Sequence, residues 1–279
     1  MQIVWCLGGL GNQMFQYAFY RKLELMGREV YLDLSEFNNY DLHNGFELQK
    51  IFALAPKIIP SIAVKKFRQN KFFKVLARLK LYQRIISQSE FNFNSKYLDY
   101  SFSRYLTGYW QSELYFAEIE QQIKEDFTFP SLDAANQLIA NQISNTNAIS
   151  LHVRMGDYVN HPLHGGICTK EFYLRAIDII KDTVEDPQFF VFSNEIEWCK
   201  NNLPLANAVY VEGNNGENSY RDMQLMSMCK HNIIANSSFS WWGAWLNTNP
   251  NKVVIAPSKW FNDERINTCD LLPGSWIKI

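Results

Sequence analysis

Arg154 and Asp157 follow directly on an apolar run, residues 149–153, that the pattern predicts to be a buried strand. In open α/β sheets the ligand lies just beyond the carboxyl ends of such strands. A guanidinium is always charged and presents a planar fork of donors, so it suits a phosphate or diphosphate better than a lysine does. We therefore predict that Arg154 binds a phosphate group. The alternative is that Arg154 and Asp157 only pair with each other across a turn.

A second group of donors lies where a short predicted strand, 232–235, leads into a helix predicted at 241–246. The group consists of Asn236, Ser237, Ser238, Phe239 and Ser240. Hydroxyl and amide donors beside the positive end of a helix dipole provide a favourable position for a phosphate. Serines also act as plain helix caps, but capping explains one serine more easily than all three. We predict that this segment binds substrate.

Residues 8–13 (GGLGNQ) are predicted to form a tight turn between a strand at 2–7 and a helix at 13–26. Gly27 is predicted to close that helix, and a second strand follows at 29–33. Backbone amides at a helix N-terminus can face an anion or a sugar hydroxyl. We predict that Gly11, Asn12 and Gln13 contact substrate, and the alternative is that the glycines only bend the chain.

The same unit admits a dinucleotide-binding interpretation. Gly9 and Gly11 precede a helix, and Asp33 lies about 20 residues further on. Met14 stands where the third glycine of that fingerprint is expected. An oxidoreductase that binds NAD is therefore the less favoured hypothesis.

Tyr109, Trp110 and Gln111 combine flat apolar faces with polar tips, a mixture that binds sugar rings. They stand where an aromatic strand end is predicted to break into a helix that continues to about residue 127. We include them among the candidate substrate-binding residues. The alternative is ordinary packing in the core.

Composition and charge argue against several classes of protein. The chain has 27 Lys and Arg against 28 Asp and Glu, so it has no overall positive field that would bind a nucleic acid. The five cysteines are scattered and never spaced as C-x-x-C, so we expect neither disulfides nor a metal site, and no cofactor. No leader-like or membrane-spanning stretch is recognisable, and we expect a cytoplasmic protein.

Residues 48–89 contain no acidic residue, whereas Lys and Arg accumulate there among apolar residues. Over 65–84 the pattern predicts a basic amphipathic helix or helix pair. Such a segment can lie on an anionic membrane surface, which would make the protein peripheral at the inner face of the membrane, or it can guide a phosphate-bearing acceptor. The alternative is a solvated helix face.

The elements that position these residues follow an α/β pattern. After a polar helical stretch at 130–147, the second half alternates strands at 149–153, 188–192, 208–211, 232–235 and 252–256 with helices at 170–183, 194–202, 219–230 and 241–246. We predict a domain boundary near residue 147 and a C-terminal tail that packs back on the first domain. Ser219 and Asp222 have the spacing of a capping box, so we expect Asp222 to cap a helix rather than to catalyse.

With these residues identified, the chain resembles the bacterial α-1,2-fucosyltransferases of glycosyltransferase family 11. The resemblance spans nearly the whole chain, and its pieces occur in the expected order. They are GGLGNQMFQYAF at 8–19, GYWQSE at 108–113, HVRMGDYV at 152–159, FSNEIEWC at 192–199 and MSMCKHNIIANSSFSWWGAWLN at 226–247.

The resemblance implies the glycosyltransferase B architecture, an α/β fold with two Rossmann-like domains that face each other across a cleft. Residues 1–147 would form the acceptor-side domain, 148–257 the domain that binds the GDP-sugar, and 258–279 the tail. The implied reaction transfers L-fucose from GDP-fucose to the 2-hydroxyl of a terminal galactose, with inversion and without a required metal. The implied acceptor is a galactose-terminated oligosaccharide of a bacterial surface glycan, free or lipid-linked.

Carried onto this sequence, the resemblance implies that Arg154 holds the β-phosphate and that Ser237, Ser238 and Ser240 surround the pyrophosphate. Ser193, Asn194 and Glu195 would lie near the guanosine. Two positions depart from the family pattern: Met155 replaces a second arginine, and Asn194 and Glu195 stand where two acids are usual.

An inverting transfer needs a base that takes the acceptor proton. Asp157 and His152 are the candidates. A nearby Arg154 would lower the pKa of Asp157 and make it a poor base, and a histidine inside a strand is more often structural. Three alternatives remain open: a fucosyltransferase of other linkage, a transferase that uses another sugar nucleotide, and a nucleotide- or glycan-binding module without turnover.

Overall fold

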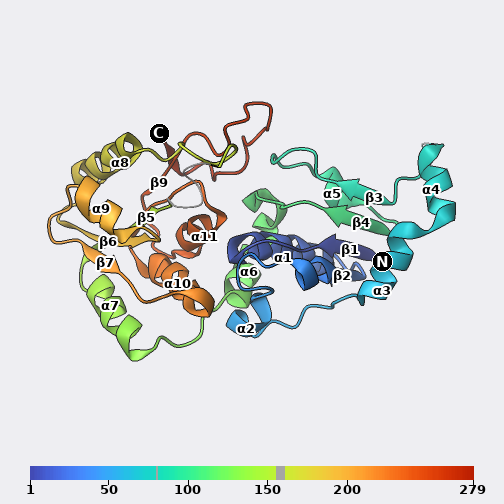
Figure 1. The fold of residues 1–279 in the computed structure, drawn as a ribbon, viewed down its shortest axis with the longest axis horizontal. Coiled ribbons are helices and arrows are strands. Elements are labelled where there is room, and N and C mark those ends of the chain that lie inside the picture. Colours follow the sequence, from blue (N-terminus) through green and yellow to red (C-terminus); the bar gives the residue numbers. More distant parts are fainter. Residues whose placement is uncertain (80, 155–160) are drawn as a thin grey trace. The chain divides into compact units, whose positions relative to one another are not determined.

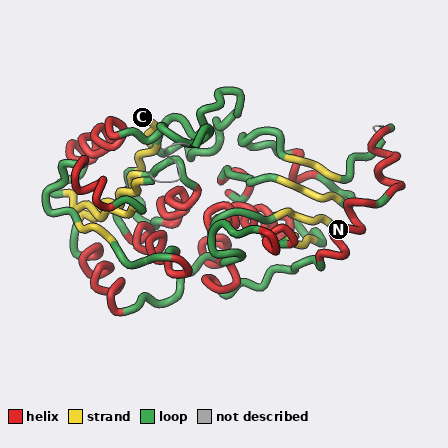
Figure 2. The backbone as a smooth tube through the Cα atoms, in the orientation of Figure 1, coloured by secondary structure: helices red, strands yellow, loops and turns green. Residues whose placement is uncertain are grey.

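The computed structural model describes residues 1–79, 81–154 and 161–279, which form two compact units (Figure 1). The first unit comprises Met1–Phe129 and Asn267–Leu271, and the second comprises Pro130–Ile266 and Leu272–Ile279. Each unit contains a parallel β-sheet with helices around it (Figure 2). Within these ranges, none of the helices combines the length and the apolar character needed to cross a bilayer.

The first unit is built on a four-stranded parallel sheet in the order β2-β1-β4-β3. Its strands are β1 (Gln2–Trp5), β2 (Val30–Asp33), β3 (Ile85–Ser87) and β4 (Arg104–Thr107). Its helices are α1 (Leu10–Leu25), α2 (Leu48–Phe52), α3 (Ser61–Gln69), α4 (Lys71–Arg78), α5 (Lys96–Asp99) and α6 (Glu120–Asp126). Because β1 pairs with β2 on one side and with β4 on the other, the strand order reverses at β1.

Helix α1 begins at Leu10, three residues before its predicted start, because the glycine turn is tighter than expected. Gly8 has a φ of 107°, and a Cβ at this position would lie 2.9 Å from Nδ2 of Asn12. Only glycine fits such a turn without strain. At the other end, Gly27 takes a φ of 76° just after the helix, as predicted.

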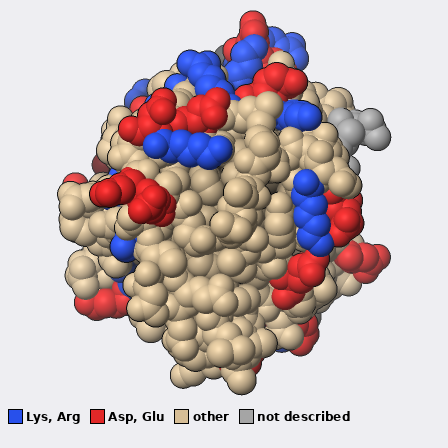
Figure 3. Space-filling model, turned by 90° about the vertical axis from the view of Figure 1, so that its left-hand side faces the viewer, with Lys and Arg blue, Asp and Glu red and all other residues tan. Residues whose placement is uncertain are grey.

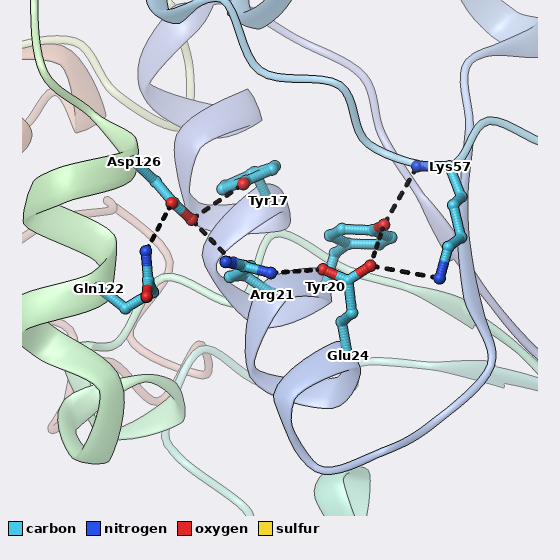
Figure 4. Close-up of polar contacts among 7 residues, drawn as sticks. All are labelled: Tyr17, Tyr20, Arg21, Glu24, Lys57, Gln122 and Asp126. Atoms are coloured by element: carbon cyan, nitrogen blue, oxygen red, sulfur yellow. Dashed lines mark hydrogen bonds and ion pairs between the residues drawn. The ribbon is translucent and has the colours of Figure 1, made fainter.

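A partly buried polar network holds α1 in position (Figure 4). The carboxylate of Asp126 in α6 accepts hydrogen bonds of 2.9 Å from the Tyr17 hydroxyl and from Nε of Arg21. Arg21 also pairs with Glu24 at 2.7 Å, and the Glu24 carboxylate lies 3.5 Å from the ammonium group of Lys57. These charge-assisted contacts join α1 to α6 and to the segment before α3.

Asp33, the acid of the possible dinucleotide fingerprint, is fully buried at the end of β2. Its carboxylate accepts hydrogen bonds from the Tyr105 hydroxyl at 2.6 Å and from the Ser35 amide at 2.8 Å. The carboxylate therefore stabilises the fold internally and is not exposed to a ribose. This arrangement removes the main residue that supported an oxidoreductase.

The second unit is built on a six-stranded parallel sheet in the order β10-β9-β8-β5-β6-β7. Its strands are β5 (Asn147–Val153), β6 (Pro187–Ser193), β7 (Val209–Val211), β8 (His231–Ile233), β9 (Val254–Ala256) and β10 (Ile277–Lys278). Its helices are α7 (Ala134–Ser144), α8 (Lys170–Thr183), α9 (Ile196–Asn202), α10 (Tyr220–Met228) and α11 (Ser238–Leu246). Numbered from β5, this is the 3-2-1-4-5-6 order of a Rossmann sheet.

Strand β5 is buried on both faces, as its apolar run predicts. Ile149, Leu151 and Val153 pack in one hydrophobic cluster with α8 and α9. Ala148 packs in a second cluster with α7, α10 and residues of β6 and β7. Residue 152 shares the register parity of Ala148, so the alternation of the strand directs His152 to this second face.

The chain passes from the first unit to the second after Phe129, earlier than the expected boundary at 147. The reason is that α7 packs on the second sheet, through Ala140 and Ile143. Of the tail at 258–279, only Asn267–Leu271 belongs to the first unit. The residues after it return to the second unit and end in β10.

The predicted capping box at the start of α10 does not form. Ser219 occupies the N-cap position but makes no side-chain cap hydrogen bond within the described chain. The Asp222 carboxylate instead accepts a hydrogen bond of 2.8 Å from Nδ2 of Asn214. Burial raises the pKa of Asp222 from 3.8 to about 7, and the hydrogen bond from Asn214 opposes this rise.

Candidate functional site

The order of the second sheet reverses at β5, which has β6 on one side and β8 on the other. Ligands of doubly wound sheets bind at the carboxyl ends of the strands at this point. The register pairs Leu151 with Ile233, so the segments that follow β5 and β8 leave the sheet side by side. These segments carry Arg154 and residues 236–240, the two groups for which the sequence predicted phosphate binding.

Helix α11 begins at Ser238, three residues before its predicted start, because Ser237 forms the N-cap. The Ser237 hydroxyl accepts a hydrogen bond of 3.3 Å from the Phe239 amide. The buried Ser240 hydroxyl donates to the Ser237 carbonyl at 3.4 Å. Ser238 and Phe239 are only half-buried. Ser237 and Ser240 thus shape the turn, whereas Ser238 is the half-buried serine of the three.

Asn236 has a positioning role in this arrangement. Its side chain is buried, and its Nδ2 donates to the carbonyls of His164, at 3.1 Å, and Trp260, at 3.3 Å. Its Oδ1 accepts from the Cys168 thiol at 3.5 Å. These contacts join the N-terminal end of α11, which we call its mouth, to two neighbouring loops. We expect Asn236 to act on a ligand through its neighbours rather than by contact.

Arg154 directly follows the last residue of β5. Its backbone amide donates to the hydroxyl of Tyr173 in α8, at 3.4 Å. This hydrogen bond joins the end of β5 to α8. Asp157 and Met155 lie outside the residues that the structure describes.

His152 is buried inside β5, and its ring centroid lies 6.0 Å from that of Phe239 at the mouth of α11. Among the described residues, its Nδ1 has no hydrogen-bond partner. Burial and the positive charge of Arg154 lower the pKa of His152 from 6.5 to about 3. The imidazole is therefore neutral near pH 7, and such a low pKa makes it a poor base.

The carboxyl end of β6 adjoins that of β5, because the register pairs Val153 with Ser193. The Ser193 hydroxyl accepts a hydrogen bond of 2.9 Å from the Glu195 amide and so forms a tight turn. Asn194 and Glu195 are exposed in this turn. The predicted nucleoside contacts thus adjoin the strand that leads to Arg154.

In the first unit the corresponding reversal lies between β1 and β4. Asn12, in the first turn of α1, and Gln111, in the segment after β4, meet there. Nε2 of Gln111 donates to Oδ1 of Asn12 at 2.7 Å. Gln111 is buried, whereas Asn12 is half-buried. Asn12 is thus the better candidate for contact with a substrate, and Gln111 orients it.

Two other candidate residues of the first unit are buried within the protein. Gln13 is fully buried, donates to the carbonyls of Gly8 and Gly45 at 2.8 and 2.7 Å, and accepts from the Glu47 amide at 2.9 Å. Gly11 is likewise buried within α1. These residues stabilise the turn and are not exposed to a ligand.

Trp110 is also fully buried and has a φ of 55°. Its ring stacks on Phe19 with centroids 4.1 Å apart. No face of the ring is open to a sugar, so the core-packing alternative describes Trp110 better. Tyr109, by contrast, is half-buried and lies edge-on to Trp5, with centroids 5.7 Å apart.

The structure adds residues that the sequence reasoning missed, namely Trp5, Tyr40 and His43. His43 is exposed and so close to the glycine turn that a Cβ on Gly9 would lie 3.2 Å from its Nδ1. Its ring centroid is 6.0 Å from that of Tyr40. These residues border the carboxyl ends of β1 and β2. The signal in Trp5 was its position at a strand end, but the irregular segment around His43 gave no pattern.

No group of three or more His, Cys, Asp or Glu side chains arranged to hold a metal ion occurs in the part of the chain that the structure describes. The described residues at the two strand ends provide a guanidinium, hydroxyl groups and half-buried aromatic rings.

Comparisons with known proteins identify related glycosyltransferases. The family model described as glycosyl transferase family 11 matches residues 2–279. The alpha-1,2-colitosyltransferase of Escherichia coli is 38% identical over 290 residues, which cover 98% of this chain and 96% of that protein. The O-antigen biosynthesis glycosyltransferase WbnK of Escherichia coli is 36% identical over 309 residues, with 98% and 99% covered. The galactoside alpha-(1,2)-fucosyltransferase 2 of Rattus norvegicus is 26% identical over 252 residues, with 86% and 65% covered.

A solved structure shows the same fold. A mutant of Arabidopsis thaliana FUT1 in complex with GDP superposes with a TM-score of 0.56 at 12% identity, covering 99% of this chain and 76% of that one. At this identity the likeness concerns the fold alone. It confirms the expected α/β fold of the glycosyltransferase B type.

Proposed function

The chain belongs to glycosyltransferase family 11, and we propose that it transfers L-fucose from GDP-fucose to the 2-hydroxyl of a terminal galactose, with inversion and without a required metal. The observation that carries the donor half is the strand-order reversal of the second sheet. It brings a fixed cation, Arg154, and the mouth of α11 to the carboxyl ends of adjacent strands. A diphosphate is the ligand chemistry that suits such a pair.

In this proposal Arg154, Ser238 and the first amides of α11 stabilise the negative charge that develops on GDP as it leaves. Donors that are fixed before the reaction lower the barrier most when they face charge that exists only in the transition state. His152, which is neutral near pH 7, adds no second positive charge beside Arg154. Ser193, Asn194 and Glu195 would bind the nucleoside. Asp157 remains the proposed base or orienting group.

The acceptor half rests on the first unit. Half-buried Tyr109 and Trp5, with Asn12 and the exposed His43, provide ring faces and polar tips at the carboxyl edge of that sheet. This mixture fits a galactose ring. The name of the O-antigen relative supports an acceptor in a bacterial surface glycan, for which a lipid-linked, galactose-terminated oligosaccharide is the proposed form.

A second candidate donor follows from the 38% identity to a colitosyltransferase. Colitose is L-fucose without its 3-hydroxyl group. A site that hydrogen-bonds this hydroxyl discriminates strongly against the deoxy sugar, whereas an apolar site accepts both. A direct competition between GDP-fucose and GDP-colitose therefore distinguishes the two donors.

The test uses the purified full chain, each GDP-sugar in turn and a panel of β-galactosides, with GDP release and the linkage of the product as readouts. We expect an α-1,2-linked fucosyl product in the presence of EDTA. Arg154→Ala should lower kcat by at least about a hundredfold, as losing one transition-state donor does. The matched control is Arg175→Ala, which removes an exposed arginine of α8 in the same unit.

Three results would contradict the proposal in different ways. Activity that disappears with EDTA and returns with Mn²⁺ would overturn metal independence. Turnover of GDP-colitose alone would replace the donor. Nucleotide binding without turnover of any galactoside would make the protein a binding module.

A further inference from the structure

The acid-free segment of residues 48–89 concentrates positive charge in the first unit. It holds ten of the 27 Lys and Arg of the chain and none of the 28 Asp and Glu. Elsewhere the signs are mixed: Figure 3 shows a face of the second unit on which basic and acidic side chains lie next to one another. The segment includes α3 and α4, and it belongs to neither of the two strand-end sites.

Helix α4 exposes a row of apolar side chains. Phe72, Val75 and Leu79 are 65%, 51% and 61% exposed, and their spacing of three and four residues puts them on one face of the helix. Leu81, just after the helix, and Phe102 are 72% and 68% exposed. We call Phe72, Val75 and Leu79 the apolar stripe. Single exposed apolar residues are ordinary, but a contiguous group marks a surface that binds something.

The opposite side of α4 is packed against its own unit. The exposure of the stripe therefore does not result from a loosely held helix. The guanidinium of Arg84 lies between the rings of Phe67 and Phe73, 3.4 and 4.0 Å from their centroids. The Phe73 ring also packs against Tyr82, with centroids 5.4 Å apart. These cation–π and ring contacts fix the face that α4 turns toward its own unit.

Exposed cations accompany the apolar stripe. Lys71 and Arg78 of α4 precede Phe72 and Leu79 by one residue each and so line one edge of the stripe. Lys65 and Lys66 of α3 are exposed as well. A helix with an apolar face bordered by Lys and Arg has the composition of one that lies in a membrane interface.

We propose that α4 binds an anionic lipid bilayer, with the apolar stripe among the acyl chains near the headgroups and the neighbouring cations on the lipid phosphates. Charge complementarity selects this occupant, since the whole segment lacks acids. A lipid surface tolerates any helix orientation in its plane and needs no matching pocket. The proposal stands independently of the reaction, although a lipid-linked acceptor would lie in the same membrane.

The experiment is co-sedimentation of the purified full chain with vesicles of phosphatidylcholine alone or mixed with phosphatidylglycerol. We expect binding to the mixed vesicles only, weakened by high salt because exposed charges are screened. The double variant Val75→Asp/Leu79→Asp and the double variant Lys71→Gln/Arg78→Gln should each lower the partition coefficient by at least about tenfold.

Two matched controls accompany these variants. Leu138→Asp alters an apolar residue of α7 that is 66% exposed, and Lys170→Gln/Lys181→Gln removes two exposed cations of α8. Both should bind vesicles like the wild type. All variants should retain wild-type thermal unfolding and activity on a soluble galactoside, which separates this proposal from the proposed reaction. Wild-type protein that ignores anionic vesicles, or α4 variants that bind as well as the controls, would overturn the proposal.

Discussion

One residue separates His152 from Arg154, and the two side chains differ in charge at neutral pH. Arg154 carries a guanidinium, the side-chain group whose planar donors suit a phosphate. His152 loses its charge, because burial and the adjacent guanidinium both disfavour a second cation. The pair thus presents a single positive charge at the end of β5. His152 therefore adds no second positive charge beside the Arg154 guanidinium at neutral pH.

The first prediction concerns pH. The folded protein holds the pKa of His152 near 3, below its ordinary value of 6.5, so protonation favours the unfolded chain. The contribution to stability is therefore complete above pH 6.5 and is lost as the pH falls toward 3. Urea unfolding at a series of pH values should show this slope in the wild type and a smaller slope in His152→Asn.

The same variant tests the assignment of the base. If His152 is not the base, the acid limb of kcat/KM keeps its midpoint in His152→Asn, even if the rate falls. A limb that moves or disappears would restore His152 as the base.

The second prediction concerns Asp222 and has the opposite sign. Burial raises its pKa in the folded protein from 3.8 to about 7. The unfolded chain ionises first, so stability declines as the pH rises from 3.8 to about 7 and then levels off. Asp222→Asn, which can still accept from Asn214, should remove this decline in urea unfolding. Equal slopes in the two proteins would show that Asp222 is ionised in the fold at much lower pH.

The sequence predicted which residue types lie at the site. It did not predict which of their atoms already make contacts within the protein. An arginine that follows an apolar run is expected at the end of a buried strand, and Arg154 directly follows β5. Gln13 and Trp110 have equally suggestive types, yet their polar atoms or ring faces are taken up by the protein itself. Which atoms are already paired depends on tertiary contacts, and local sequence does not record these.

Among the elements, the long buried strands β5 and β6 were predictable from the sequence, whereas the short edge strands β3 and β10 were not. β5 and β6 appear as continuous apolar runs because both faces of a central parallel strand are covered. β3 and β10 have three and two residues and lie at sheet edges, so they leave almost no pattern. Helix α7 was recognised as a helix, but its polar composition did not show that it packs on the second sheet.

The third prediction tests how α11 is held. A Cβ at Gly243 would lie 2.9 Å from Cβ of Met226 in α10. Gly243→Ala gains about 1 kcal/mol of helix propensity but overpacks this contact by about 1–3 kcal/mol. We expect lower stability in urea unfolding and weaker GDP binding, because the mouth of α11 shifts.

A matched control is available for this substitution. Gly274→Ala adds the same methyl group where no heavy atom lies within 4 Å of the new Cβ. This variant should unfold like the wild type. If Gly243→Ala did the same, the close approach of α10 and α11 would not constrain the site.

At the scale of the whole molecule, the chain passes between its two units three times: after Phe129, after Ile266 and after Leu271. The excursion of Asn267–Leu271 is held by backbone contacts, such as the Phe91 amide donating to the Asn267 carbonyl at 3.1 Å. The sequence predicted two α/β domains and a tail that returns to the first. It did not predict that the tail ends as a strand of the second sheet, because that strand is formed by two exposed residues.

The C-terminal segment that returns to the second unit supports α11, and this gives the fourth prediction. β10 pairs with β9, and the buried ring of Trp276 lies 5.5 Å, centroid to centroid, from that of Trp241 in α11. Ending the chain after Leu271 removes both contacts and exposes an edge of the sheet. Trp276→Ala alone should cost about 3–5 kcal/mol in urea unfolding. Because α11 provides the proposed phosphate contacts, both changes should also weaken GDP binding in calorimetry. The control is Lys278→Ala, at an exposed position of β10, which should leave GDP binding unchanged. Wild-type affinity for GDP in the shortened chain would show that α11 keeps its position without the tail.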